Sequence, residues 1–306
     1  MIQENTLQET KFRDHKLGTN DLIIKLQDNG FKSDSEKIRG CATYLKFSKQ
    51  EHQQTLEQRN KLKDANFCKF RFCEICNWRR TKKIGHQLIE ALESIEATRS
   101  VSYLFLTLTI KNPQTSDLKA TVKHINESFQ RMAQTKAYKN AVIGHFKALE
   151  ILGDDTPAGE VHPHFHIMLI VSKSYFKSEH YLSQAKWIEM WQKALRVDYK
   201  PVLDIRKIKP NVKKRLSAIK SAVYEVAKYA VKHTELTKRS SDDFTQIINQ
   251  TRGMRFFSTG GYLKEKMSIM KLDEDLIDFK EQTEAFWKEI EELLYQWKNG
   301  DYCLYS

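Results

Sequence analysis

The sequence has no long apolar run and no leader-like start. None of its 306 residues belongs to an apolar stretch of about 18 residues, the minimum for a membrane-spanning helix. The basic start, short apolar core and small-residue cleavage site of a signal peptide are also missing. These absences predict a cytoplasmic protein with no membrane partner.

Cysteine is scarce, and its placement argues against a disulfide framework. Three of the five cysteines (Cys68, Cys73 and Cys76) are crowded between positions 68 and 76. This clustering suits a reducing compartment and a metal site. Cys73 and Cys76 have the two-residue spacing that points both thiolates at one ion. With Cys68 and the more distant Cys41 as further ligands, we predict a structural zinc site; buried or idle thiols are the alternative.

Acidic residues are fewer than basic ones, and the deficit is uneven. The chain has 51 Lys and Arg against 39 Asp and Glu, a net charge of +12. Residues 273–306 have a net charge of −7, which leaves +19 for residues 1–272. A body this basic predicts a polyanionic partner, nucleic acid before membrane. Two basic clusters are the candidate DNA contacts: Arg79, Arg80, Lys82, Lys83, Lys213, Lys214 and Arg215.

Three of the ten histidines precede a short apolar run, in the sequence HPHFHIMLIV at 162–171. Its length and its β-forming residues predict a buried strand, on which His164 and His166 share one face. Residues 141–152 predict a hairpin partner that places Glu150 opposite the histidines. Two imidazoles and a carboxylate form a credible Mn²⁺ or Mg²⁺ site with open positions for substrate oxygens. The alternatives are strand-end histidines held by ordinary hydrogen bonds and a surface glutamate.

Residues 216–233 predict a helix with an unusual polar face. Glu225 and Tyr229 are four residues apart and therefore lie on one side, with Lys228 and Lys232 three residues on from each. A phenol needs help to act as a nucleophile near neutral pH, and neighbouring ammonium groups lower its pKa and hold a phosphate. We therefore predict a catalytic tyrosine helix; an ordinary amphipathic helix is the alternative.

Three motifs occur in order: FLTLT (105–109), HPHFHIMLIV and EVAKYAVK (225–232), preceded by RFCEICNWRR (71–80). Together they resemble the HUH-endonuclease initiators, specifically the rolling-circle replication proteins of small multicopy plasmids in Gram-positive bacteria. The resemblance covers about residues 41–265.

The resemblance assigns roles to individual residues of this sequence. It implies that His164 and His166 bind the metal, that Tyr229 attacks DNA and that Glu225 activates the water that ends the cycle. It also implies a third metal ligand before the histidine strand, which we assign to Glu150, although Glu160 and His162 lie close by.

The fold class expected from these patterns is α+β, with an antiparallel sheet. The resemblance implies five strands of ferredoxin- or RRM-like topology, with the tyrosine helix across the sheet. We expect a mobile arm or peripheral helix at 1–40, a Cys-rich zinc and DNA-binding segment at 41–98 and a nicking-joining domain at 99–265. An acidic helix is expected at 266–306, packed on its own chain or forming a homodimer.

The predicted function is a metal-dependent, site-specific DNA nicking-closing enzyme that starts plasmid rolling-circle replication. It would keep a 5′-phosphotyrosine at the origin and release a 3′-OH primer to host helicase and polymerase. A relaxase or transposase of the same chemistry is one alternative. A non-catalytic zinc-containing DNA-binding repressor is another, but it leaves the histidine strand and the tyrosine helix unexplained.

Overall fold

The computed structural model describes residues 3–210, 217–227, 233–267, 276–277 and 286–305. The chain divides into two compact units, one formed by residues 1–83 and 271–306 and the other by residues 84–270. The first is called unit 1 and the second unit 2. No helix in the described ranges is both long and apolar enough to cross a bilayer.

Unit 2 is built on a five-stranded antiparallel sheet, which confirms the predicted sheet. The strand order is β6-β3-β5-β4-β7, so the histidine strand lies in the middle. The strands are β3 (Val101–Leu108), β4 (Gly144–Glu150), β5 (His164–Ser172), β6 (Leu203–Lys207) and β7 (Phe257–Gly261).

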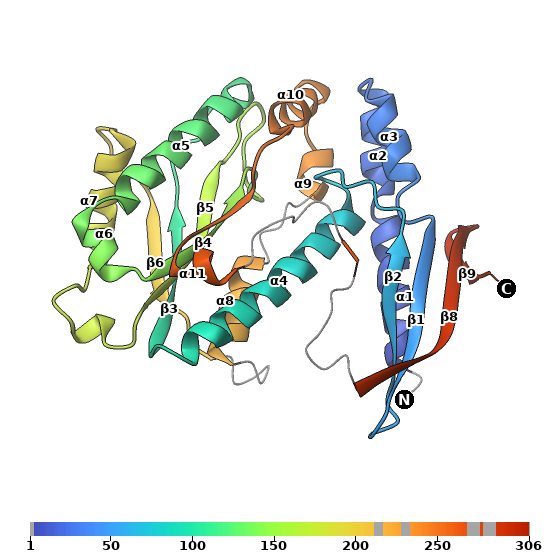
Figure 1. The fold of residues 1–306 in the computed structure, drawn as a ribbon. Helices are drawn as coiled ribbons and strands as arrows, with labels where there is room; N and C mark the ends of the chain where they lie inside the picture. Colours follow the sequence, from blue (N-terminus) through green and yellow to red (C-terminus); the bar gives the residue numbers. More distant parts are fainter. Residues whose placement is uncertain (1–2, 211–216, 228–232, 268–275, 278–285, 306) are drawn as a thin grey trace. The chain divides into compact units, whose positions relative to one another are not determined.

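Helices cover both faces of this sheet. Figure 1 shows α5 (Leu118–Ala133), α6 (Lys136–Ala141) and α7 (Gln184–Leu195) on one face. On the other face are α8 (Ala218–Ala227) and the later part of α4 (Glu74–Glu96). The remaining helices of unit 2 are α9 (His233–Thr237), α10 (Ser241–Thr251) and α11 (Tyr262–Lys266), with short 3₁₀ turns at Thr115–Asp117 and Tyr175–Lys177.

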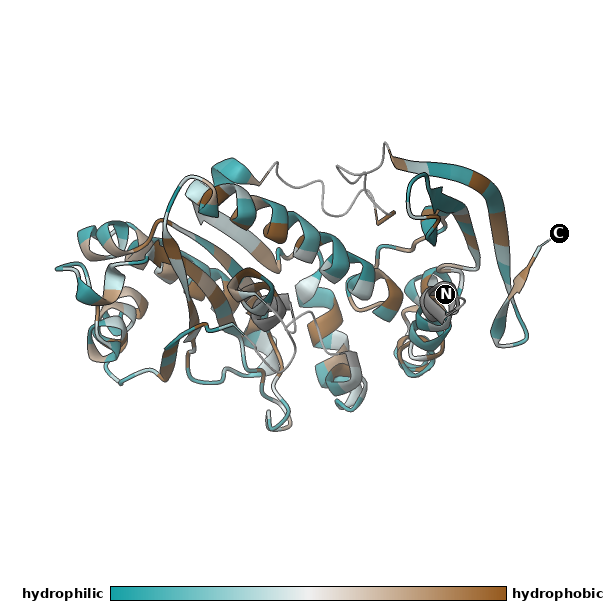
Figure 2. Cartoon of the chain, turned by 90° about the horizontal axis from the view of Figure 1, so that it is seen from below, coloured by the Kyte–Doolittle hydropathy of each residue, from teal (hydrophilic) through white to brown (hydrophobic). Residues whose placement is uncertain are grey.

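The core of unit 2 follows from the alternation of β5. Phe165 points toward α5, where its ring meets Phe129 edge-on at 6.1 Å. His164 and His166 project from the opposite face, because neighbouring residues of a strand alternate sides. Figure 2 shows hydrophobic residues concentrated on the strands and the inner helix sides, with hydrophilic residues outside. The metal-ligand candidates are thus carried by a strand that is fixed from behind by aromatic packing.

Unit 1 contains a second sheet, of four antiparallel strands in the order β2-β1-β8-β9, which the sequence did not predict. Its strands are β1 (Tyr44–His52), β2 (Gln58–Ala65), β8 (Trp287–Lys298) and β9 (Asp301–Leu304). Three helices precede it: α1 (Gln3–Leu17), α2 (Asn20–Asp28) and α3 (Lys32–Arg39). Phe12 of α1 is fully buried, with its ring 4.9 Å from Trp78 and 6.1 Å from Phe47. Phe12 therefore anchors α1 in unit 1, and the three helices favour the helical alternative for residues 1–40 over a mobile arm.

The predicted acidic C-terminal helix is wrong over residues 287–304, which form β8 and β9. The rest of that prediction falls largely outside the described residues. The strand forms because β8 pairs with β1, so that Tyr295 meets Leu45 and packs beside Phe47 at 5.9 Å. Lys46 and Glu292 also form an ion pair across the strands at 3.0 Å. Local spacing matched a helix, but a partner strand far away in sequence determines the conformation.

The unit boundaries also differ from the predicted domains. Helix α4 begins at Glu74, inside the predicted Cys-rich segment, and its residues from 84 onward belong to unit 2. The C-terminal segment returns to unit 1 and does not form a separate element. The Cys-rich segment thus shares its unit with both ends of the chain.

Candidate metal centres

Glu150, His164 and His166 converge at the end of the β4–β5 hairpin. Glu150 is the register partner of His164, as the predicted hairpin required. The Nε2 atoms of His164 and His166 are 2.9 Å apart, and they lie 3.3 and 3.0 Å from Glu150 Oε2. All three residues are buried, with 6–7% of their surface exposed. The geometry brings together the three residues predicted as metal ligands.

The spacing of these three atoms fits one face of an octahedral ion. Ligands at about 2.1 Å and at right angles to one another are about 3.0 Å apart, whereas a tetrahedral ion would separate them by about 3.4 Å. Two of the three distances, 2.9 and 3.0 Å, match the octahedral value, and the third, 3.3 Å, lies nearer the tetrahedral one. The group could therefore hold an ion that keeps further positions open for oxygen ligands.

Hydrogen bonds behind the histidines orient both rings. His164 Nδ1 lies 2.7 Å from the carbonyl of His162, so Nδ1–H donates and Nε2 keeps its lone pair. His166 Nδ1 lies 3.3 Å from the hydroxyl of Thr107, its register partner on β3. The ring of Phe105 stacks on His166 at 5.4 Å. The FLTLT motif thus supplies the wall that fixes His166.

The protonation states suit metal binding. Burial would raise the pKa of Glu150, but its close interactions with the imidazoles of His164 and His166 outweigh burial and lower the pKa to about 2. Burial lowers the pKa of His166 below its ordinary value, against the opposing effect of Glu150. At neutral pH the site therefore offers an ionised carboxylate and a neutral His166 imidazole, the forms that coordinate a cation.

His162 and Glu160, the other third-ligand candidates, do not join the group formed by Glu150, His164 and His166. His162 turns away, with Nδ1 2.6 Å from Asn112 Oδ1. Sequence reasoning missed Asn112, because nothing in its local pattern marks it as a partner of a histidine that is distant in the sequence.

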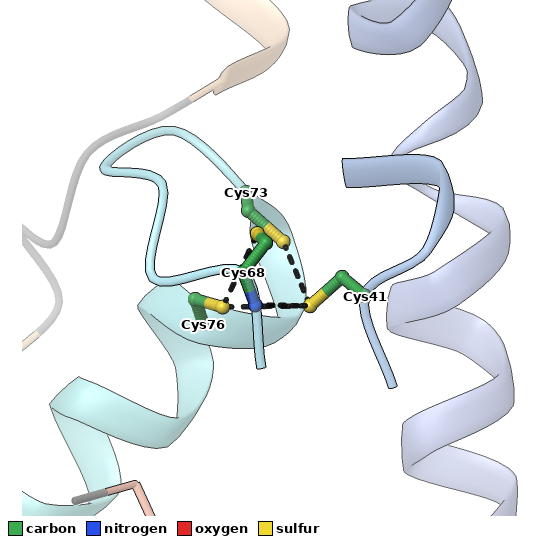
Figure 3. A group of neighbouring side chains, drawn as sticks. All are labelled: Cys41, Cys68, Cys73 and Cys76. Atoms are coloured by element: carbon green, nitrogen blue, oxygen red, sulfur yellow. Dashed lines mark hydrogen bonds between the residues drawn. The ribbon is translucent and has the colours of Figure 1, made fainter. Parts of the chain in front are cut away.

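Four cysteines of unit 1 form a second cluster. Sulfur atoms lie 3.5 Å apart for Cys41 and Cys76, 3.6 Å for Cys68 and Cys76, and 3.7 Å for Cys41 and Cys73. Four thiolates at about 2.3 Å from a tetrahedral ion would be about 3.8 Å apart. Figure 3 shows the sulfurs converging from the segment after α3, the 68–73 loop and the start of α4. The cluster is therefore of the kind that binds zinc.

Without a cation the cluster does not hold four thiolates. Hydrogen bonds from neighbouring sulfurs lower the pKa of Cys41, whereas those to Cys41 raise the pKa of Cys73 and Cys76. A bound metal would have to displace these protons. Cys76 lies in the first turn of α4, where the helix dipole favours its thiolate form.

Two buried cations support the cluster, and the sequence did not single out the first of them. Lys16 of α1 is 5% exposed, and its ammonium donates to the carbonyls of Arg39, at 2.8 Å, and Cys41. Burial lowers the pKa of Lys16, and the four cysteine sulfurs oppose this by raising it. Arg80 donates to the carbonyls of Phe70, at 3.3 Å, and Lys69, within the loop that carries Cys68 and Cys73.

The residues predicted to contact DNA differ in their exposure to solvent. Arg79 and Arg80 are each 2% exposed, and Arg79 Nε donates to the Leu276 carbonyl at 2.8 Å. This burial corrects the prediction for these two, because their guanidinium groups support the fold instead of facing a polyanion. Lys82 is exposed and Lys83 is half-buried. Lys213, Lys214 and Arg215 fall outside the described residues.

The predicted tyrosine helix is described only in its first part. Helix α8 packs against β3 and β5, with Ile219, Ala222 and Val223 buried. The backbone of Glu225 belongs to α8. Tyr229, Lys228 and Lys232 lie beyond the described end of α8, so their predicted roles remain predictions.

Comparison with known proteins identifies the family. The profile of the replication protein family Rep_1 matches residues 59–303, most of the chain. The chain belongs to the Rep_1 family. This confirms the resemblance to replication proteins of Gram-positive bacteria. The Rep_1 match covers both the cysteine cluster's 68–76 segment and the Glu150–His164–His166 group.

The alignments with individual relatives cover most of this chain. The Protein rep of Bacillus amyloliquefaciens is 32% identical over 289 residues, 87% of this chain and 83% of that protein. The Protein rep of Lactiplantibacillus plantarum is 33% identical over 277 residues, 85% and 84% of the two chains. That of Streptococcus pneumoniae is 32% identical over 240 residues, covering 78% and 72%. No solved structure matches the chain.

Proposed function

We propose that this Rep_1 protein is a metal-dependent DNA nicking-closing enzyme that initiates plasmid rolling-circle replication. The observation that carries the proposal is the buried triangle of Glu150, His164 and His166 on adjacent strands of a Rep_1 chain. Three ligands on one side of an ion leave positions open for phosphate oxygens. The relatives of this chain are named replication proteins, and a net charge of +12 is consistent with a DNA partner.

Mn²⁺ or Mg²⁺ is the ion that suits this donor set and its near-octahedral spacing. When bound, it would neutralise the scissile phosphate and hold it in place. The surrounding residues of the chain orient the imidazole rings of His164 and His166. The His162 carbonyl fixes the tautomer of His164, and Thr107 and Phe105 hold the ring of His166.

Tyr229 is the proposed nucleophile. Its hydroxyl oxygen bonds to the scissile phosphorus while the bond from phosphorus to the 3′ oxygen breaks, and the phenolic proton ends on that oxygen. The products are a 5′-phosphotyrosine and a 3′-OH primer for the host polymerase, with a host helicase opening the duplex ahead. Lys228 and Lys232 would lower the pKa of the phenol and bind phosphate. Glu225 would take a proton from water in the closing hydrolysis.

The packing of α8 supports this assignment. The helix lies against β3 and β5, the strands that carry Thr107 and His166. Tyr229 follows α8 in the sequence, two residues beyond the described end of the helix at Ala227. The tyrosine segment therefore continues from a helix anchored on the same two strands as the metal-ligand candidates.

The cysteine cluster is proposed to bind structural zinc and to hold unit 1 together. Its four ligands come from two distant segments, Cys41 and residues 68–76, so one ion would join the end of α3 to the start of α4. Unit 1 would then present Lys82 and Lys83 for recognition of origin DNA. Origin duplex or hairpin DNA is the proposed partner of this unit.

A direct test mixes the protein with single-stranded origin DNA and Mn²⁺ and looks for a covalent adduct on denaturing gels. We expect an adduct that EDTA abolishes. His164→Ala, His166→Ala and Glu150→Ala should lose the adduct and also Mn²⁺ binding measured by calorimetry. His180→Ala, which removes an exposed histidine of the same unit, is the control and should behave as wild type. Equal Mn²⁺ affinity in all five proteins would refute the metal assignment, and DNA binding without any adduct would favour a repressor.

A further inference from the structure

A pocket of about 460 Å³ adjoins the metal-ligand group in unit 2. The chain after β3 forms one wall and residues before β6 form the other, with His162 at one end. Its volume falls within the range of about 300–1,000 Å³ found for small-ligand sites. The lining side chains that carry the argument are Lys111, Asn112, His162, Tyr199 and Lys200.

The pocket and the metal-ligand group share a wall. The ring centroids of His162 and His164 are 4.5 Å apart. The backbone carbonyl of His162 accepts from His164, while the side chain of His162 lines the pocket. A phosphate held by an ion on His164 and His166 would therefore lie close to the pocket wall formed by His162.

One end of the pocket offers both a donor and an acceptor. His162 Nδ1–H donates to Asn112 Oδ1 at 2.6 Å, so the Nε2 atom of His162 keeps its lone pair. The same hydrogen bond uses the Asn112 carbonyl oxygen and leaves the two N–H donors of its amide. Among the described residues, none accepts a hydrogen bond from this amide nitrogen. An adjacent donor and acceptor match the polar edge of a nucleobase, as in recognition of unpaired bases.

The rim of the pocket supplies positive charge and an aromatic surface. Lys111 Nζ lies 4.4 Å from the ring centroid of Tyr199, whose hydroxyl accepts from the Lys111 backbone N–H at 3.1 Å. Lys111 and Lys200 are exposed, and no described carboxylate lies within ion-pairing distance of either ammonium group. Ammonium groups beside an aromatic ring are the usual elements of a single-strand DNA channel.

The pocket walls are fixed without a ligand. The hydroxyl of Thr109 donates to the Val202 carbonyl at 2.8 Å and ties the two walls together. Below them, the indole of the fully buried Trp191 donates to the Thr109 carbonyl at 2.7 Å. A preformed pocket loses little conformational entropy when a ligand enters.

We infer that this pocket binds one nucleobase of the single-stranded DNA, next to the phosphate held at the metal site. Asn112 and His162 read the base edge, and Lys111 and Lys200 contact the flanking phosphates. The inference rests on the proposed nicking function and adds a position at which the substrate sequence is recognised.

The test compares the full-length wild type with Asn112→Ala and Asn112→Asp. Asn112→Asp keeps the acceptor for His162, and so the local structure, but replaces both amide donors. Asn140→Ala, at an exposed asparagine of α6 in the same unit, is the matched control. Affinities are measured by fluorescence anisotropy for an origin oligonucleotide and for a panel with one abasic nucleotide at each position around the nick.

We expect one abasic position beside the nick to weaken binding to the wild type and to Asn140→Ala by about tenfold. Both Asn112 variants should bind the intact oligonucleotide about tenfold more weakly and should lose sensitivity at that position only. An abasic profile identical to that of the wild type in both folded variants would overturn the inference. Failure of the nicking function would appear separately, as a wild type that binds the panel but forms no covalent adduct.

Discussion

Lys147 is a lysine whose ammonium group is buried in unit 2. It lies on β4, 7% exposed, on the face of the sheet opposite Glu150. Its ammonium donates to Asn126 at 2.6 Å and lies 4.1 Å from the ring centroid of Phe165. Burial lowers the pKa of Lys147 to about 7. Burial of the protonated Lys147 side chain therefore lowers the free energy of unfolding at neutral pH.

The pH dependence of stability should report on Lys147. Between about pH 7 and pH 10 the unfolded chain holds this proton and the folded chain does not, so unfolding takes up a proton and stability rises with pH. The slope from this one group is about 1.4 kcal/mol per pH unit. Lys147→Met should lose that slope and be more stable than wild type at pH 7.5. Denaturant unfolding at pH 7.5 and 9 measures both quantities, with the exposed Lys173→Met as control. An unchanged slope in Lys147→Met would show that the ammonium is not buried.

Lys16 should matter for metal retention. Its buried ammonium is near all four cysteine sulfurs, and a four-thiolate zinc site carries a net charge of −2 that this cation would partly balance. Lys16→Met should therefore weaken zinc binding about tenfold, as loss of a supporting group around a metal site commonly does. Competition with a colorimetric chelator measures the affinity. Lys32→Met, an exposed lysine at the start of α3, should match wild type. Equal zinc affinity in the two variants would make Lys16 a packing residue only.

Strand β8 places acidic side chains beside basic side chains of the β1–β2 hairpin. Glu292 pairs with Lys46 at 3.0 Å, Glu291 with Lys49 at 3.5 Å, and Glu289 with Lys63 at 3.7 Å. These pairs are half-exposed and screened by salt, so each contributes little to stability. Their consequence is electrostatic, because they cancel positive charge that β1 and β2 would otherwise present.

Neutralising this strand should tighten non-specific DNA binding. The variant Glu289→Gln, Glu291→Gln, Glu292→Gln keeps the strand but releases three lysines. We expect higher affinity for random-sequence DNA at low salt, and a plot of log affinity against log salt steeper by about two. The control changes the exposed Glu57, Glu93 and Glu179 to Gln, which alters the net charge equally. If both triple variants bind alike, net charge alone matters and β8 does not shield the hairpin.

Across the whole molecule, local sequence patterns predicted the central hairpin of unit 2 best. The alternation around His164 and the turn at 153–161 are short-range signals, and they predicted the β4–β5 hairpin and with it the position of Glu150. Leu118, Val122 and Ile125, spaced by four and three residues, likewise fall on the buried face of α5, the helix that covers the sheet.

Long-range pairing explains what could not be predicted. Ser48 of β1 donates to Glu289 of β8 at 2.5 Å although the two are 241 positions apart. No local window contains that pairing, so the spacing of apolar residues alone predicts a helix for the C-terminal segment. The burial of Arg79 and Arg80 depends in the same way on tertiary partners, and so does the link between Asn112 and His162. Sequence spacing identified residue types suited to the chemistry, whereas tertiary contacts determine which of them face a substrate.

The proposal that Tyr229 is the nucleophile is tested most directly by identifying the residue that becomes attached to DNA. Tyr224 is the other tyrosine of the 216–233 segment and serves as the comparison. The wild type, Tyr229→Phe and Tyr224→Phe are incubated with single-stranded origin DNA and Mn²⁺, and the adduct is digested and sequenced by mass spectrometry. The proposed function predicts a nucleotide on Tyr229 in the wild type and in Tyr224→Phe, with near-normal DNA binding but no adduct in Tyr229→Phe. A nucleotide on Tyr224, or an adduct that persists in Tyr229→Phe, would contradict the assignment.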